Sequence, residues 1–93
     1  MRIFYSPESI EDLRRLREFI EIKNPTAARK TAASILKGIK QLRSFPYLGV
    51  EVTQAPNPEM IRDLMTGNYI VRYLVNGEEI YVLRVWLHKE IRL

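Results

Sequence analysis

Apolar side chains recur at helical spacing through the first half of the chain. The first stripe of this kind predicts one buried helix face and consists of Ile10, Leu13, Leu16, Phe19 and Ile20. Ser6 and Pro7 mark the start of this helix, because Ser caps a helix N-terminus and Pro fits the first helical position. We therefore expect a helix from Pro7 to about Lys23, preceded by a short strand over Arg2 to Tyr5.

A second helix begins with the same signal at Asn24-Pro25. Its apolar positions fall four and three residues apart, which is typical of a helix packed lengthwise on a neighbour, and they are Ala28, Ala32, Ile35, Ile39 and Leu42. Phe45-Pro46 ends the pattern. Two helices joined at Asn24-Pro25 predict an antiparallel hairpin in which small Ala residues allow close approach.

The second half of the chain changes to strand-like patterns. Residues 46–59 read mostly as loop with a short strand at 50–53, and the β-rich runs are 60–66, 69–75 and 79–87. Gly67-Asn68 and Asn76-Gly77 separate these runs, and Asn-Gly favours a tight turn with two positive φ angles. The sequence therefore predicts one α+β domain over residues 1–93, with an N-terminal helical hairpin packed on a small twisted antiparallel sheet.

The alternation of residues in the last predicted strand indicates two different faces. We expect the uncharged set to face the helices, and this set is Tyr81, Leu83, Val85 and Leu87. Arg84 and Trp86 then lie on the open face, where Arg72 and Arg62 of the preceding strands would join them. Aromatic and Arg side chains mixed on a sheet face are typical of nucleic-acid binding, and equally of cross-strand packing pairs.

Charge is unevenly distributed along the chain. Fifteen basic and eleven acidic residues give a net charge of +4. A basic run without any acidic neighbour comprises Arg29, Lys30, Lys37, Lys40 and Arg43. Such a run suits an acidic partner, either nucleic acid or an acidic protein segment, and it is also typical of an ordinary solvated helix face.

Composition excludes several kinds of site. The chain has no Cys, which excludes disulfides and thiolate chemistry, and its single His argues against a His-built metal site, so we expect neither metal nor cofactor. No apolar run reaches the 18 or so residues that a membrane span needs, and the start lacks a signal-peptide stretch. We therefore expect a cytoplasmic protein. His88, near Glu90, suits either proton transfer or simple solvation.

The order of elements and several motifs resemble the RelE/ParE superfamily of toxins from bacterial type II toxin–antitoxin systems. The resemblance covers the whole chain and depends on the Ser-Pro-Glu-Ser-Ile-Glu-Asp-Leu helix start, Arg62-Asp63-Leu64, Tyr69 with Tyr73, and Leu83-Arg84-Val85 followed by His88. It implies one of two activities. RelE-like members cleave messenger RNA on the ribosome, whereas ParE-like members inhibit DNA gyrase.

The chain departs from the nuclease pattern at three places. Asp63 and Ile70 stand where the resemblance implies a Lys and an Arg, and no Tyr follows Tyr81. The closing Leu-Arg-Val and His88 resemble the ParE branch. The resemblance thus implies a gyrase inhibitor that acts by binding, held by a cognate antitoxin in a hetero-oligomer. A ribosome-dependent endonuclease and a binding-only protein are the alternatives.

Three sets of site residues follow from these expectations. The target-binding set is Arg62, Arg72, Arg84, Trp86, His88, Lys89 and Arg92. The antitoxin-binding set is Arg29, Lys30, Lys37, Lys40 and Arg43. Under the nuclease alternative the catalytic residues would be Arg62, Arg84, His88 and Lys89.

Overall fold

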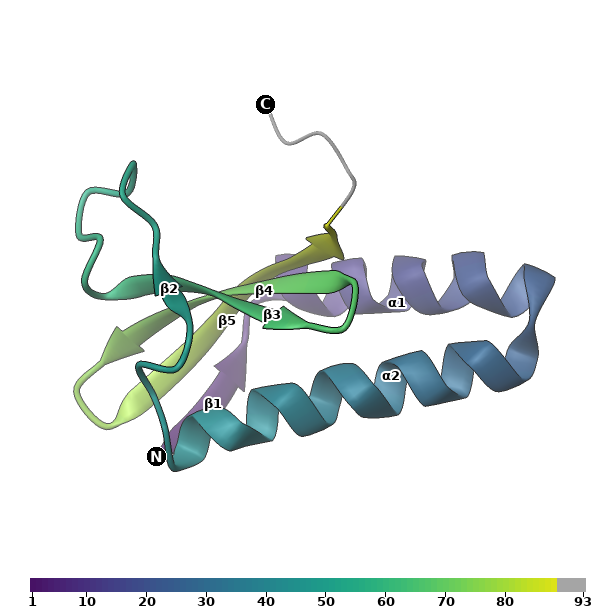
Figure 1. The fold of residues 1–93 in the computed structure, drawn as a ribbon, viewed down its shortest axis with the longest axis horizontal. Coiled ribbons are helices and arrows are strands. Elements are labelled where there is room, and N and C mark those ends of the chain that lie inside the picture. Colours follow the sequence, from purple (N-terminus) through teal and green to yellow (C-terminus); the bar gives the residue numbers. More distant parts are fainter. Residues whose placement is uncertain (89–93) are drawn as a thin grey trace.

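A helical hairpin packs against a five-stranded sheet and extends past it at one end (Figure 1). The computed structural model describes residues 1–88. The elements in chain order are β1 (Arg2–Tyr5), α1 (Pro7–Lys23), α2 (Pro25–Lys40), the short 3₁₀ helix η1 (Gln41–Arg43), β2 (Val50–Glu51), β3 (Ile61–Thr66), β4 (Tyr69–Asn76) and β5 (Glu79–Leu87). Among the described residues, no helix combines the length and the apolar character that crossing a membrane requires.

Both helices begin as predicted and α1 ends as predicted, whereas α2 ends at Lys40, before the predicted stop at Phe45-Pro46, and continues as η1. The Ser6 side chain accepts a hydrogen bond from the Ser9 N–H at 2.9 Å. Asn24 serves both helices, because its N–H donates to Ile20 O at 2.8 Å while its side-chain oxygen accepts from the Ala27 N–H at 3.1 Å. One residue thus ends α1 and begins α2, which makes the connection of the hairpin as short as a chain reversal allows.

The sheet is mixed, which corrects the prediction of an antiparallel sheet. The strand order is β1-β5-β4-β3-β2, and β2 to β5 pair antiparallel as expected. β1, however, pairs parallel to β5, with Arg2 beside Glu79 and Tyr5 beside Val82. The chain leaves β1 through both helices and returns by the meander, and such a long crossover permits parallel pairing of the first and last strands.

The β4–β5 turn differs by one residue from the Asn-Gly turn that the sequence predicts. Asn76 pairs with Glu79, so the two loop residues are Gly77 and Glu78. Gly77 has φ of +62°, and no non-glycine residue in the described part of the chain has a positive φ. A positive φ at the first loop position alone is the pattern of a type II′ turn, which fits the strand twist as well as the type I′ turn does.

The core confirms the seam of α2 and corrects that of α1. Ile35, Ile39 and Leu42 are buried against β3, β4 and β5. On α1 the predicted stripe is not buried, since Ile10 and Phe19 are 56% and 60% exposed and the rest of the stripe is half-buried. The buried residues of α1 are Ser9 and Asp12 instead. The reason is that α2 covers the sheet, whereas only the first turns of α1 reach β5.

A β-bulge in β5 corrects the predicted faces of that strand. Arg72 pairs with Arg84 but Tyr73 pairs with Val82, so Leu83 is the extra residue. Ile80 and Val82 before the bulge are therefore buried together with Val85 after it. Two further placements differ from the expectation. Tyr81 stacks on Phe4 with ring centroids 5.3 Å apart, and Trp86 is only 5% exposed.

Tyr73 holds the loop that leads into β2. Its hydroxyl donates to Pro46 O at 2.8 Å and accepts from the Gly49 N–H at 2.9 Å. Gly49 is required by this close approach, because a Cβ there would lie 2.8 Å from Asp63 O and 2.9 Å from the Tyr73 ring. The contact fixes the backbone of residues 46–49 on the end of the sheet.

We expect Tyr73→Phe to lower the free energy of unfolding by about 1–2 kcal/mol, because the buried Gly49 N–H loses its acceptor. Urea denaturation measures this change. Tyr47→Phe is the matched control, because Tyr47 is exposed, and it should change stability by less than about 0.5 kcal/mol. Equal effects of the two substitutions would show that the Tyr73 hydroxyl has no anchoring role.

Candidate functional site

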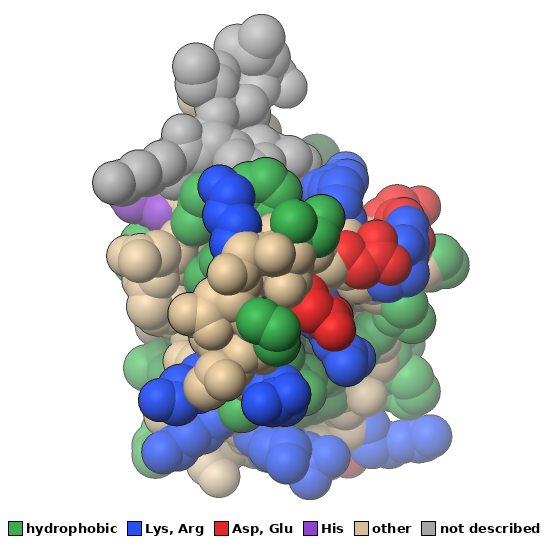
Figure 2. Space-filling view, turned by 90° about the vertical axis from the view of Figure 1, so that its right-hand side faces the viewer, with side chains coloured by type: hydrophobic (Ala, Val, Ile, Leu, Met, Phe, Trp, Pro, Cys, Tyr) green, Lys and Arg blue, Asp and Glu red, His purple; other side chains and the backbone are tan. Residues whose placement is uncertain are grey.

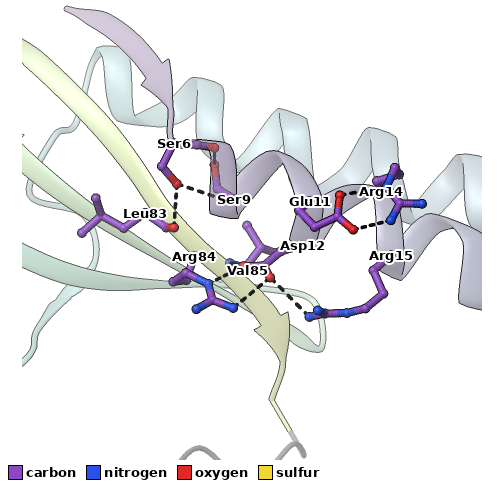
Figure 3. Close-up of polar contacts among 9 residues, drawn as sticks. All are labelled: Ser6, Ser9, Glu11, Asp12, Arg14, Arg15, Leu83, Arg84 and Val85. Atoms are coloured by element: carbon purple, nitrogen blue, oxygen red, sulfur yellow. Dashed lines mark hydrogen bonds and ion pairs between the residues drawn. The ribbon is translucent and has the colours of Figure 1, made fainter.

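Four hydrogen bonds converge on the carboxylate of Asp12, on the first turns of α1. Arg84 donates to it from Nε at 2.8 Å and from Nη2 at 3.0 Å, and the Val85 N–H donates at 2.9 Å. Arg15 adds a fourth contact at 3.2 Å. Figure 3 shows these groups converging on Asp12 beside the bulge of β5. The Ser6 hydroxyl donates a hydrogen bond to O of the bulge residue, Leu83. Asp12 therefore fastens α1 to the distal half of β5.

The environment of Asp12 keeps its side chain ionised although that side chain is only 2% exposed. Burial raises the pKa of the carboxyl group, but hydrogen bonds from Arg84 and from the Val85 N–H, with the charges of Arg84 and Arg15, outweigh burial. The net effect holds the pKa of Asp12 below its ordinary value. Asp12 is thus a fixed negative charge in the folded protein at neutral pH.

The second arginine of the open sheet face is paired in the same way. Arg72 donates to Asp63 on the neighbouring β3 from Nε at 2.9 Å and from Nη2 at 3.0 Å. Its guanidinium also lies 5.0 Å from the centre of the Trp86 ring. Hydrogen bonding to Asp63 raises the pKa of Arg72 above its ordinary value. Both open-face arginines therefore form bidentate ion pairs with carboxylates.

Arg62 lies apart from these two arginines, which corrects the expectation that it joins the open face. It pairs with Tyr73, a core residue, so its side chain leaves β3 on the side of the helices. There it donates to Gly49 O at 3.0 Å and to Glu59 O at 3.2 Å, and its guanidinium lies 4.8 Å from the centre of the Tyr47 ring. Arg62 thus braces the loop over residues 46–60.

The remaining predicted target residues lie at the end of β5. The His88 side chain is exposed and its backbone N–H donates to Asn68 O at 2.7 Å. Lys89 and Arg92 lie outside the described residues. Trp86 belongs to the open face by register but is buried, so a partner would reach Arg72 and Arg84 more readily than the indole ring. The target-binding role of this set stays a prediction.

Sequence reasoning missed both carboxylates that organise this face. Asp12 is an ordinary acidic residue in the sequence, because the helix dipole favours negative charge in the first turns of a helix. Its spacing carried a further signal, because it lies three residues after Ser9 and four before Leu16, on the side of α1 that meets β5. Asp63 on β3 is paired directly with Arg72 on the adjacent strand β4, and this pairing could be found only once the register was known.

An apolar groove runs between α1 and α2. It has a volume of about 260 Å³ and its apolar lining consists of Leu13, Leu16, Ile20, Ala28, Ala32, Ile35 and Leu36. Phe19 and Ile22, 60% and 86% exposed, continue apolar character along α1. The groove lies where the two helices face each other, in the hairpin that extends past the sheet (Figure 1).

The predicted antitoxin-binding cations form a separate surface. Arg29, Lys30, Lys37, Lys40 and Arg43 are all exposed, and none of them lines the groove. Their binding to an antitoxin stays a prediction. The part of the chain over residues 1–88 contains no cluster of His, Asp or Glu side chains that could hold a metal ion.

Comparison with known proteins identifies the family. A family model described as the ParE toxin of the type II toxin–antitoxin system parDE matches residues 3–92. No curated protein matches. A solved structure, the chromosomal ParDE toxin–antitoxin system from P. aeruginosa, superposes with a TM-score of 0.79 at 21% identity, over 94% of this chain and 95% of that chain, and so shares the fold. Because the family model spans nearly its whole length, this chain belongs to the ParE toxin family, the toxin component of type II toxin–antitoxin systems.

Proposed function

We propose that this toxin inhibits DNA gyrase by binding it, without breaking a bond, and that a cognate antitoxin neutralises it in the cytoplasm. The observation that carries the proposal is the pairing of both open-face arginines. Cleavage of RNA without a metal needs cations aimed at the charge that develops on the phosphate. Here the Arg72 and Arg84 guanidiniums are held by Asp63 and Asp12, each through two hydrogen bonds.

The paired arginines suit recognition of a protein surface. Each keeps more than a third of its side chain exposed, while its carboxylate partner fixes the orientation of the guanidinium. Arginine held in this way offers its outer N–H groups to a partner at little entropic cost. A sheet face with two oriented arginines therefore favours binding over catalysis.

The groove between α1 and α2 supports an antitoxin as the second partner. An apolar groove between two helices is the usual seat of an amphipathic helix, whose apolar residues at i, i+3 or i+4, and i+7 fill it. Leu13, Leu16 and Leu36 would be covered by such a segment. The covered area would also stabilise the toxin by mass action, because the partner binds only the folded chain.

Two assays on the purified chain test this proposal side by side. We expect inhibition of supercoiling by gyrase and no ribosome-dependent cleavage of messenger RNA. Arg72→Gln should raise the toxin concentration for half-inhibition by about tenfold, the effect of one charge-assisted hydrogen bond. Glu18→Gln, an exposed change on α1, is the control that should leave inhibition unaltered.

The nuclease alternative gives the opposite pattern. Codon-specific cleavage by the purified chain, slowed about 100-fold by Arg72→Gln with ribosome binding intact, would overturn the gyrase proposal. Loss of inhibition in Glu18→Gln as well would show that the open face is not the contact surface. Circular dichroism of each variant confirms that it is folded.

A further inference from the structure

The exposed side of α2 is a basic surface without compensating charge. We call it the α2 basic face, and it consists of Arg29, Lys30, Lys37, Lys40 and, on η1, Arg43. No ion pair involves these five side chains within the described part of the chain. No acidic residue occurs between Glu21 and Glu51.

On the neighbouring helix α1, by contrast, arginine side chains form ion pairs with carboxylates. Arg14 on α1 pairs with Glu11 and Glu18, Arg15 pairs with Asp12, and Arg17 pairs with Glu21. Figure 2, seen from the tip of the hairpin, shows Lys and Arg side chains gathered on the side of α2, with the acidic side chains toward α1. The two helices therefore present a neutralised surface and an unneutralised one.

The α2 basic face lacks what a protein interface needs. Protein interfaces have an apolar centre surrounded by a polar rim. On this helix only Leu36 is a large exposed hydrophobic residue, and it lines the groove on the other side. Two small exposed residues accompany the cations, Thr26 one turn before Arg29 and Ala33 between Lys30 and Lys37, and they allow the helix backbone to come close to a ligand. Charge without an apolar centre is typical of contact with phosphates.

The spacing of the cations fits a phosphodiester backbone. Residues 29 to 43 span about 21 Å at the rise of 1.5 Å per residue. At 100° per residue the five side chains fall within about 140° of the helix circumference, so one ligand surface can meet them all. Over that length each strand of duplex DNA presents about six phosphates.

We infer that the α2 basic face binds the phosphate backbone of duplex DNA without sequence preference. The inference extends the proposed function, since gyrase acts on duplex DNA and the toxin would then contact enzyme and DNA together. The open sheet face would contact the enzyme, and the α2 basic face would contact the DNA that the enzyme holds. An acidic antitoxin segment is the competing ligand for the same cations.

Fluorescence anisotropy with a labelled 25-base-pair duplex of mixed sequence tests the inference on the purified full chain. We expect binding that weakens with salt, with a slope of log K against log salt of about −4.5, because each of the five neutralised phosphates contributes about −0.9. Lys37→Gln/Lys40→Gln should weaken binding at least tenfold and reduce the slope by about 2. Arg14→Gln/Arg17→Gln, with the same change in net charge on the paired helix, should leave both values near those of the unmodified chain.

Four results would overturn the inference. Equal loss in both double variants would mean that net charge, not this face, attracts DNA. Tighter binding of single-stranded RNA than of the duplex would assign the face to RNA. Binding of polyglutamate in place of the duplex, lost in Lys37→Gln/Lys40→Gln, would assign it to an acidic protein. Inhibition of gyrase is measured separately, so a chain that inhibits gyrase without binding the duplex refutes this inference alone.

Discussion

Asp12→Ala should lower the free energy of unfolding by about 2–4 kcal/mol. The substitution leaves the Val85 N–H buried without an acceptor and removes the partner that Arg84 and Arg15 share. Because Arg84 is partly exposed, water replaces some of its lost contacts, which places the effect below that of a fully buried pair. A domain of this size has only about 5–15 kcal/mol of stability, so the loss is a large fraction of it. Urea denaturation at pH 7 measures the change.

The same residue predicts how stability depends on pH. The folded pKa of Asp12 lies below its unfolded value of about 3.9, so its contribution is fully present above that pH. It is lost as the pH falls through the folded pKa. The stability difference between the unmodified chain and Asp12→Asn should therefore be greatest near neutrality and shrink below about pH 4. Glu11→Gln, at an exposed neighbouring carboxylate, is the control and should shift stability little. A difference that persists unchanged at low pH would refute the ionic role of Asp12.

Ile39→Ala should lower the free energy of unfolding by about 2–5 kcal/mol, because Ile39 is fully buried under the sheet and its truncation leaves a cavity. Leu13→Ala removes a side chain of the same size, but Leu13 lines an open groove where water already has access. We therefore expect it to cost less than half as much in the free chain. Thermal and urea denaturation of the two variants compare them directly.

The roles of Ile39 and Leu13 should reverse when the antitoxin is present. If the groove seats the antitoxin, Leu13→Ala should weaken the complex, whereas Ile39→Ala should act on the folding of the toxin alone. Equal destabilisation of the free chain by the two substitutions would show that the groove is closed in solution. Unchanged antitoxin affinity in Leu13→Ala would place the antitoxin elsewhere.

The local elements of this fold could be predicted from sequence because their signals are local. Ser6 with Pro7 and Asn24 with Pro25 set both helix starts, and the bounds of β5 follow from its apolar run. The predictions that were wrong concern features that depend on contacts between segments distant in the sequence. The parallel pairing of β1 with β5 and the bulge at Leu83 leave no periodic signal in the chain.

The candidate site was predicted in residue type but not in arrangement. Arg72 and Arg84 do share the open face, where the alternation of the strands had placed them. Their partners Asp63 and Asp12 became recognisable only through cross-strand register and the position of α1. Arg62 was misplaced because the register of β3 depends on its pairing with Tyr73, which the residues of β3 alone do not determine.

The pairing of the first strand with the last has a consequence for synthesis of the toxin. β1 is synthesised before the other strands, yet its partner β5 begins only at Glu79. The acceptors of the Ser6 N–H and hydroxyl, Val82 O and Leu83 O, are therefore synthesised later still. At roughly 5–20 residues per second, β1 is without its neighbour for about 4–15 s of translation. Neither the contacts of Asp12 with Arg84 and Val85 nor the cross-strand pairing of Arg72 with Arg84 can form in that interval, since both need β5. The contacts that orient Arg84 on the open face therefore form only after the final strand has left the ribosome.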